Sequence, residues 1–329
     1  MNFTPAPLLA PFWLNNAHAD TIITRFFPKI RPPYRREWHR DSSDQTNIAY
    51  DFLDSNRAEA PLLVLFHGLE GSSLSHYAAR ITSAAHKIGW HAVVPHFRGC
   101  GGVENTARCI YHSGDSQEIA FVLNQLQQKY PKIVAVGVSL GGNALAKYLG
   151  ETGQAARVEA AVIISAPINL PAAGKAMAEG INARLYSPYF LRSLLPKVRR
   201  MKALYPDLPI PAAAQPKTLR DFDDLYTAPL AGFANAEDYY QRASGLPYLR
   251  RIMRPTLLLN AQNDPFLPAQ FLPTAQDVSS FVQLCQPKRG GHVGFVSGKF
   301  ILKINWLEQT TLDFLRAAMA AFPDKHRAS

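Results

Sequence analysis

Short, strongly apolar runs alternate with helical patterns from about residue 45 to the end of the chain. The runs at 62–66 and 133–138 contain no charged residue, which is typical of strands that are buried on both faces of a sheet. Segments between such runs repeat apolar residues at intervals of three and four, as amphipathic helices do. The alternation therefore predicts an α/β fold with a mostly parallel central sheet flanked by helices.

The same pattern locates the individual elements of this fold. Strands are expected at 62–66, 91–94, 133–138, 160–164, 256–259 and 281–284, and helices at 77–88, 115–129, 143–149 and 305–321.

The alternation stops between residues 168 and 254. This stretch holds seven prolines from Pro188 to Pro229 and has no clear strand, which indicates a helical cap inserted between two strands of the sheet. We therefore expect an irregular, proline-rich arm over 1–40 and a core formed by 41–167 and 255–329. The cap, 168–254, would cover the core.

One serine lies where a nucleophile is expected in such a fold. Ser139 is the centre of Gly137-Val138-Ser139-Leu140-Gly141, which follows an expected strand and precedes an expected helix. A sharp turn between strand and helix crowds the positions two before and two after its centre, and glycine at both positions relieves that crowding. The pattern matches the nucleophile elbow of serine hydrolases, although a structural turn would carry the same residues.

A serine nucleophile needs a base and an acid, which in this type of fold follow it in the order acid, then histidine. Asp264 comes just after the expected strand at 256–259, so it is the candidate acid. Asp277 is a rival within a predicted helix. The acidic group in the cap is interpreted as a solvated face or as helix starts; it comprises Asp221, Asp223 and Asp224.

His292 is the candidate base. It follows the last expected strand and the flexible pair Gly290-Gly291, and it precedes the closing helix. The other histidine after Asp264 is His326, which lies in the tail of the chain. The sequence thus predicts a catalytic triad of Ser139, Asp264 and His292.

An oxyanion hole needs two backbone N–H groups near the nucleophile. We expect one from Leu140, directly after Ser139. The other is expected from Leu69 in His67-Gly68-Leu69-Glu70-Gly71, which follows the strand at 62–66. Glu70 has two interpretations: either it starts the next helix, or its side chain orders the loop that carries Leu69, which we call the oxyanion loop.

Composition excludes several other classes of protein. With 47% hydrophobic and 18% charged residues, the chain can bury a large core. Three scattered cysteines (Cys100, Cys109 and Cys285) predict neither a disulfide framework nor a zinc site. The amino-terminal segment has no charged residue before Asp20, and prolines interrupt its apolar stretch. Neither a signal peptide nor a transmembrane helix is therefore expected. We expect a soluble cytoplasmic protein without metal or organic cofactor.

The chain is basic, with a net charge of +10. The basic residues cluster at 31–36, 197–202 and 250–254, and none of these clusters lies in a recognisable nucleic-acid motif. We interpret the clusters as solvated faces or as surfaces for weak attraction to anionic membranes. No nucleic-acid partner is expected, and the pattern leaves the oligomeric state open.

Several longer strings resemble one known family. They include His67-Gly68-Leu69-Glu70-Gly71-Ser72, Tyr111-His112-Ser113-Gly114, Ser139-Leu140-Gly141-Gly142-Asn143, the cap string at 222–229, Asn263-Asp264-Pro265-Phe266 and Gly290-Gly291-His292-Val293-Gly294-Phe295. The chain resembles the α/β-hydrolase fold family over nearly its whole length, and within it the bacterial YheT-type esterases and the related eukaryotic abhydrolase-domain proteins. Asn15-Asn16-Ala17-His18 stands where the family more often has Asn-Pro-His.

The resemblance implies a serine hydrolase that acts on esters, with its triad at Ser139, Asp264 and His292. We interpret the protein as a carboxylic ester hydrolase for short- to medium-chain acyl esters or lipid-derived esters. Three alternatives remain: an acyltransferase that uses the same acyl-enzyme, a binding module without activity, and a nucleic-acid-binding protein. The cap aromatics form either an acyl site or the cap's own core; they are Tyr186, Tyr189, Phe190, Phe222, Tyr226 and Phe233, together with Leu191.

Overall fold

Eight strands form one sheet in the computed structural model, which describes residues 3–298 and 301–322. The strands are β1 (Arg35–Arg40), β2 (Asn47–Leu53), β3 (Leu62–Phe66), β4 (His91–Pro95), β5 (Ile133–Val138), β6 (Ala160–Ile164), β7 (Thr256–Leu259) and β8 (Val282–Cys285). Their order across the sheet is β1-β2-β4-β3-β5-β6-β7-β8. The pairs β1–β2 and β2–β4 are antiparallel and all others are parallel, so the predicted mostly parallel sheet is confirmed.

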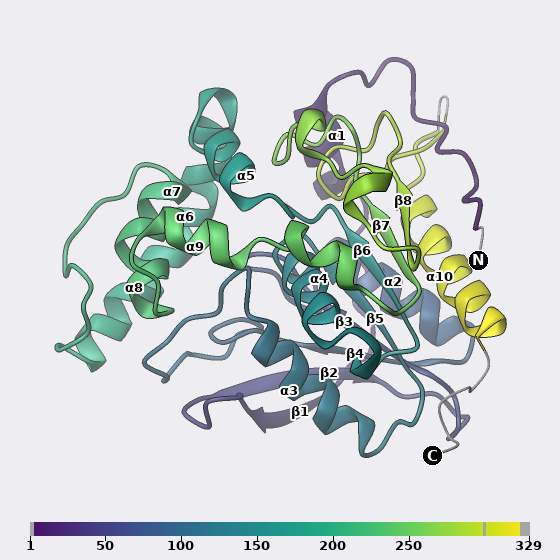
Figure 1. The fold of residues 1–329 in the computed structure, drawn as a ribbon, viewed down its shortest axis with the longest axis horizontal. Helices are drawn as coiled ribbons and strands as arrows, with labels where there is room; N and C mark the ends of the chain where they lie inside the picture. Colours follow the sequence, from purple (N-terminus) through teal and green to yellow (C-terminus); the bar gives the residue numbers. More distant parts are fainter. Residues whose placement is uncertain (1–2, 299–300, 323–329) are drawn as a thin grey trace.

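Helices lie on both faces of this sheet and at one side of it (Figure 1). The α-helices are α1 (Ala17–Ile22), α2 (His76–Lys87), α3 (Ser116–Gln127), α4 (Leu140–Thr152), α5 (Leu170–Met177), α6 (Gly180–Leu204), α7 (Leu219–Phe222), α8 (Ala228–Leu230), α9 (Ala236–Ala243) and α10 (Trp306–Ala321). Shorter helical turns are η1 (Ile23–Phe26), η2 (Gly153–Ala155), η3 (Asp223–Thr227), η4 (Leu246–Arg251), η5 (Ala269–Phe271) and η6 (Ala275–Asp277). None of the helices in the described ranges is long and apolar enough to cross a membrane.

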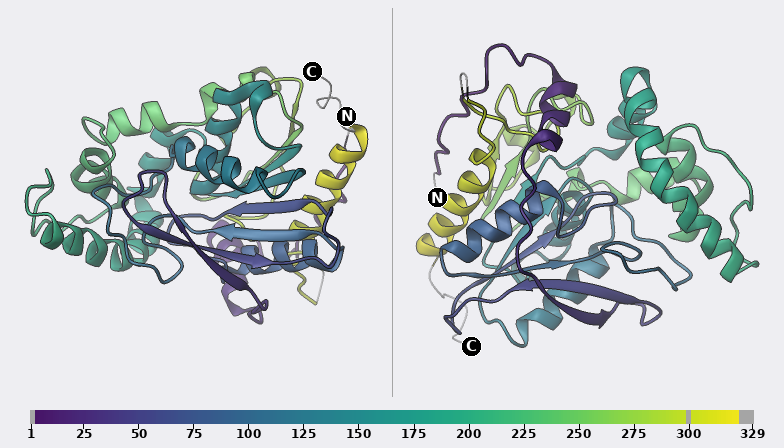
Figure 2. Two further views of the ribbon diagram at one scale, coloured as in Figure 1. Left: turned by 90° about the horizontal axis from the view of Figure 1, so that it is seen from below. Right: turned by 180° about the vertical axis from the view of Figure 1, so that it is seen from behind.

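Strand β3 shows how the two faces of the sheet are filled. Leu62, Val64 and Phe66 belong to a core cluster with the apolar residues of α3 and α4. Leu63 and Leu65 point to the other face and pack with residues of α2 and α10. The helices α2 and α10 lie side by side there, in blue and yellow (Figure 2). Each face is thus covered by helices, which explains why the strands are apolar throughout.

The inserted region between β6 and β7 is helical and contains no strand, as the sequence predicts. Helices α5 to α9 lie together, in teal and green, at one side of the sheet (Figure 1). They have apolar clusters of their own. The last part of the predicted cap differs, because Leu249 and Ile252 are buried in the core cluster that contains α4. The stretch that ends at 254 therefore returns to the core before β7 begins.

The predicted irregular arm contains two regular elements. Residues 17–22 form α1, which begins after Asn16, whose Oδ1 accepts hydrogen bonds from the N–H groups of His18 and Ala19. Residues 35–40 form β1, the edge strand of the sheet, so this end of the predicted arm belongs to the core. At the ends of the chain, residues 1 and 2 of the predicted arm and His326 lie outside the described residues.

Candidate active site

Ser139 stands in a tight turn between β5 and α4, with a φ of +53°. A Cβ atom on Gly137 would lie 2.7 Å from the carbonyl oxygen of Gly141. A Cβ atom on Gly141 would lie 2.5 Å from the carbonyl oxygens of Phe66 and His67. Only glycine fits these two positions without a shift of the backbone, and the turn lifts the Ser139 side chain to the end of the strand, as in a nucleophile elbow.

Two residues from two other loops meet Ser139. Asp264 follows β7 and His292 follows β8, so both come from the carboxyl ends of parallel strands. His292 Nε2 lies 2.9 Å from Ser139 Oγ, and His292 Nδ1 lies 2.9 Å from Asp264 Oδ2. The carboxyl group of Asp264 is buried, whereas the imidazole of His292 is partly buried. This chain of hydrogen bonds has the geometry in which an imidazole accepts the serine proton.

The other candidate acids lie elsewhere. Asp277 is half-buried and accepts hydrogen bonds from the N–H and hydroxyl of Thr274 at the start of η6. Asp221 forms a capping box at the start of α7. This agrees with the interpretation of these acids as helix starts. Asp223 begins the turn η3, but it also lines a cavity and is therefore not part of a solvated face.

Phe266 holds the imidazole of His292 in place. Its ring stacks on the imidazole with 4.0 Å between ring centroids and 24° between the planes. Its N–H donates to Asp264 Oδ1 at 2.8 Å, so the same residue also orients the acid. No pattern in the sequence predicts this role of Phe266.

The amino-terminal arm forms hydrogen bonds with the loop that carries His292. Thr21 Oγ1, on α1, accepts a hydrogen bond of 2.9 Å from the N–H of His292. The carboxylate of Asp20 pairs with the guanidinium of Arg289 through bonds of 2.8 and 2.9 Å. Asp20 also accepts from the amide of Asn263, the neighbour of the acid. The arm is therefore part of the site, and sequence reasoning missed this.

The loop after β3 presents one unoccupied N–H group. The N–H of Gly68 donates to the hydroxyl of Tyr77, and the N–H of Glu70 donates to the hydroxyl of Tyr111, both at 2.9 Å. The N–H of Leu69, which lies between them, has no acceptor among the described residues. It is therefore available to a ligand.

Leu140 presents a second such group beside the first. It is the first residue of α4, where the N–H has no acceptor within the helix. A Cβ atom on Gly68 would lie only 3.1 Å from Ser139 Cβ, so the loop after β3 passes directly against the nucleophile. Leu69, Ser139 and Leu140 line the same cavity. The two N–H groups are thus placed where they can stabilise a negative charge on a reacting carbonyl oxygen.

Glu70 orders this loop and does not start a helix, since α2 begins only at His76. Its φ is +55°, and its Oε1 accepts from the Tyr111 hydroxyl at 2.9 Å and from Lys197 Nζ at 2.6 Å. Lys197 belongs to α6 in the cap. Of the two interpretations of Glu70, the structure favours the ordering of the oxyanion loop.

His67 at the start of the loop is a structural residue. It is fully buried, and its Nδ1–H donates to the carbonyl of Gly68 at 2.8 Å while its Nε2 accepts from the N–H of Phe97 at 3.1 Å. Burial lowers the pKa of His67 to about 3, so the ring is neutral. It fixes the backbone that leads to Leu69.

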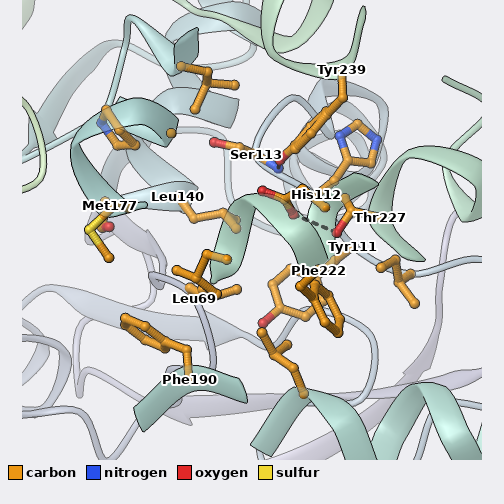
Figure 3. A pocket seen from close by; sticks show the side chains of 18 of the residues that line it. Leu69, Tyr111, His112, Ser113, Leu140, Met177, Phe190, Phe222, Thr227 and Tyr239 are labelled. Atoms are coloured by element: carbon orange, nitrogen blue, oxygen red, sulfur yellow. Dashed lines mark hydrogen bonds between the residues drawn. The ribbon is translucent and has the colours of Figure 1, made fainter. Parts of the chain in front are cut away.

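A cavity of about 150 Å³ extends from Ser139 to the cap and opens to solvent. Most of its lining is apolar. Figure 3 shows Leu69 and Leu140 on one side and Tyr239, Thr227 and Phe222 on the other. The cavity can therefore hold an apolar part of a substrate next to the nucleophile.

The cap aromatics divide between the two roles that the sequence left open. Phe190 and Phe222 line the cavity. Tyr226 and Leu191 belong to the cap's apolar core, to which Phe222 also contributes. The remaining three do not line the cavity; they are Tyr186 and Tyr189, which hydrogen-bond to His18 and Arg25 of the arm, and Phe233, which packs on Tyr239.

Charged groups are few in the cavity, and nothing there resembles a metal site. The charged residues that line it are Arg98, Lys197 and Asp223. Over residues 3–298 and 301–322, no cluster of three histidine, cysteine, aspartate or glutamate side chains could hold a metal ion.

Comparisons with solved structures agree with this architecture. The chain superposes on the esterase Est1E from Butyrivibrio proteoclasticus, solved with ferulic acid bound, with a TM-score of 0.59. The match covers 86% of this chain and 99% of that chain at 12% sequence identity. At this identity the likeness shows the fold alone.

Sequence comparisons reach closer relatives. The Escherichia coli (strain K12) protein named "Putative esterase YheT" is 39% identical over 93% of this chain and 92% of its own length. Phospholipase ABHD3 of Mus musculus is 27% identical over 93% of this chain and 77% of its own length. The family model described as "alpha/beta hydrolase fold" matches residues 61–299. The chain therefore belongs to the α/β-hydrolase fold family, and its relatives are of the esterase and lipase type.

Proposed function

We propose that this protein hydrolyses carboxylic esters through an acyl-enzyme on Ser139. The observation that carries the proposal is the hydrogen-bonded chain from Ser139 through His292 to Asp264, which opens onto an apolar cavity. The names of the relatives, an esterase and a phospholipase, point to the same class of substrate. A binding module would not need this chain of hydrogen bonds.

Each group has a defined role in the proposed reaction. Ser139 Oγ attacks the ester carbonyl while His292 Nε2 takes the serine proton, and Asp264 stabilises the imidazolium that forms. The N–H groups of Leu69 and Leu140 donate to the carbonyl oxygen as it becomes negative. The imidazolium then protonates the leaving alcohol. Water attacks the acyl-enzyme with His292 as base, which releases the acid and restores Ser139.

The cavity suits an acyl group of modest length. Apolar cavities of about 150 Å³ bind benzene, a ring of six carbons. This cavity, also about 150 Å³, would therefore hold an acyl group of about that size. This supports short- to medium-chain acyl esters, including lipid-derived ones, as substrates.

Steady-state kinetics on p-nitrophenyl esters tests the proposal. The series runs from acetate through butyrate, hexanoate and octanoate to dodecanoate. Because each buried methylene contributes about 0.8 kcal/mol, kcat/KM should rise about fourfold per methylene until the cavity is full and then fall. No hydrolysis of any ester above the rate with Ser139→Ala would refute the function. A flat profile would refute the acyl site in the cap.

Association with anionic membranes stays a prediction. The arm exposes Leu9, Phe12 and Phe26, and Arg25 and Arg31 belong to the same segment. Exposed apolar and basic side chains together are what binds a peripheral protein to anionic lipid. Sedimentation with phosphatidylserine vesicles, compared with phosphatidylcholine vesicles at two salt concentrations, tests it. Equal sedimentation with both vesicles would contradict the prediction.

A further inference from the structure

Among the described residues, three charged side chains line the cavity, and one of the three lacks a counter-charge. The guanidinium of Arg98 forms ion pairs with three carboxylates. The ammonium of Lys197 pairs with Glu70. No lysine, arginine or histidine in the described part of the chain forms an ion pair with Asp223. A carboxylate on an apolar wall without a cation is costly to bury.

The partners of Asp223 are neutral hydroxyl groups. Oδ1 accepts from Thr227 Oγ1 at 2.7 Å, and Oδ2 accepts from the hydroxyl of Tyr240 at 2.8 Å. Burial raises the pKa of Asp223 to about 6, although the two hydroxyl groups act in the opposite direction. At neutral pH the group is therefore mostly ionised. Each oxygen still has a lone pair that no described donor uses.

The carboxyl group is held at a fixed place on the cavity wall. Asp223 begins η3, a π-helical turn, and such turns are frequent at functional sites. Tyr240 reaches it from α9 across Gly174 of α5, where a Cβ atom would lie 2.5 Å from the tyrosine ring. Ser113 also lines the cavity, and its buried hydroxyl makes no hydrogen bond with a described residue, although it lies near the hydroxyl of Tyr239.

Aromatic rings share this part of the cavity with the carboxylate. Phe222, Tyr239 and Tyr240 all line it, and the rings of Tyr239 and Tyr240 lie 5.3 Å apart between centroids. Figure 3 shows Phe222 and Tyr239 on the same side of the pocket as Thr227, the partner of Asp223. Aromatic rings and a carboxylate together attract organic cations, because both present negative potential.

We propose that Asp223, together with the rings of Tyr239 and Tyr240, binds a positively charged nitrogen in the acyl group of the substrate. The subsite would select esters whose acyl group carries an ammonium group over neutral esters of the same shape. This proposal rests on the proposed function for the place of the ester carbonyl, which would lie at Ser139 while the acyl group extends into the cap.

Two isosteric esters test the preference. They are the p-nitrophenyl esters of 4-(trimethylammonio)butyrate and of its carbon analogue, 5,5-dimethylhexanoate. The wild type should have a kcat/KM at least about tenfold higher for the cationic ester, because a desolvated cation gains that much from rings alone. In Asp223→Asn the ratio of kcat/KM between the cationic and the neutral ester should fall to within about twofold of one, because asparagine keeps an acceptor for one hydroxyl but carries no charge.

Asp224→Asn is the matched control. It makes the same change in charge one residue away, and Asp224 is exposed and does not line the cavity. Asparagine also retains the oxygen that accepts from the N–H of Ala236. The control should keep the preference of the wild type. An equal loss in both variants would show a long-range effect of net charge and would overturn the subsite.

A binding measurement separates this proposal from the proposed function. Calorimetry with Ser139→Ala, which cannot form an acyl-enzyme, should show about tenfold tighter binding of the cationic ester than of the neutral one, and Asp223→Asn in that background should remove the difference. Equal binding of the two esters would overturn the subsite, and Asp223 would then only tie α9 to η3. If the wild type hydrolyses neither ester while this binding preference is present, the ester-hydrolase function is overturned instead.

Discussion

Lys197 Nζ, on a cap helix, lies 2.6 Å from Oε1 of Glu70, the residue that follows the candidate oxyanion donor Leu69. The cap is thereby tied to the loop that presents that donor. Glu70 has a positive φ, which a residue with a side chain adopts only when its surroundings hold it there. Its carboxylate is held by Lys197 from one side and by Tyr111 from the other.

Lys197→Met should therefore lower kcat on p-nitrophenyl acetate by about tenfold with little change in KM. Removal of a whole oxyanion donor costs about 10²- to 10³-fold in kcat, and a displaced donor should cost less. Lys197→Arg should restore most of the activity. Lys202→Met is the control, because Lys202 Nζ, on the same helix, donates to the carbonyls of Pro206 and Leu208. If the control loses as much activity, the tie to Glu70 does not act on the reaction.

Asp264→Asn should lower kcat by about 10⁴-fold with little change in melting temperature. The asparagine amide favours the wrong tautomer of His292, whose Nδ1 lies 2.9 Å from the acid. Asp277→Asn should leave kcat unchanged, because the carboxylate of Asp277 caps η6 and accepts from Thr274, not from His292. Steady-state kinetics and a thermal melt of both variants check this. A larger loss of kcat in Asp277→Asn would mean that the acid is misassigned.

Phe190→Ala should shift the chain-length optimum towards longer acyl groups. Phe190 lines the cavity, so its removal leaves space that added methylenes can fill at about fourfold in kcat/KM each. Tyr189→Ala is the control, because Tyr189 is 54% exposed and does not line the cavity. The p-nitrophenyl ester series measures both profiles. The same shift in both variants, or none in either, would place the acyl group elsewhere.

Asp223 should make the protein less stable as the pH rises from 4.5 to 7.5. Its pKa is about 6 in the folded protein, above the ordinary value of 3.8, so in this range the folded state holds a proton that the unfolded state has released. This contribution is fully present below pH 3.8 and is lost as the pH rises through 6. The loss should be on the order of 2 kcal/mol in the free energy of unfolding.

Urea unfolding at the two pH values checks this, with the wild type compared with Asp223→Asn. The variant should gain stability relative to the wild type at the higher pH, because it has no proton to release. A pH-independent difference between Asp223→Asn and the wild type would mean that the pKa of the Asp223 carboxyl group is not raised.

Local patterns are enough to predict much of this site. The two glycines around Ser139 indicate the nucleophile elbow, because this turn is confined to five consecutive residues and can be predicted from them alone. Asp264 and His292 each follow a strand, and parallel strands bring such positions to one edge of the sheet. The fold, including the inserted helices, could be predicted for the same reason: strand and helix periods are local.

The contacts that sequence reasoning missed are between distant segments. The bond from the N–H of His292 to Thr21 joins residues 271 positions apart, and no local pattern predicts it. The helix that carries Thr21 has a readable signal in Asn16, whose side chain caps it. Strand β1 has charged, largely exposed residues, as edge strands often do, so its apolar pattern is weak.

The basic clusters also have a use that composition does not reveal. Arg36 pairs with Asp51, and Lys197 pairs with Glu70. Arg254 donates to the carbonyl oxygens of Gln154 and Ala156. Many of these basic side chains thus stabilise the fold by pairing within it. The net charge alone could not distinguish such side chains from a basic surface that binds anionic partners.

Covalent labelling tests the central claim, that His292 activates Ser139 as the nucleophile, most directly. The purified protein is treated with a fluorophosphonate, and the modified residue is identified by mass spectrometry of its peptides. We expect stoichiometric modification of Ser139 in the wild type, none in Ser139→Ala, and labelling slowed by several orders of magnitude in His292→Ala. Modification of a different residue, or equal labelling of Ser139→Ala and the wild type, would contradict it.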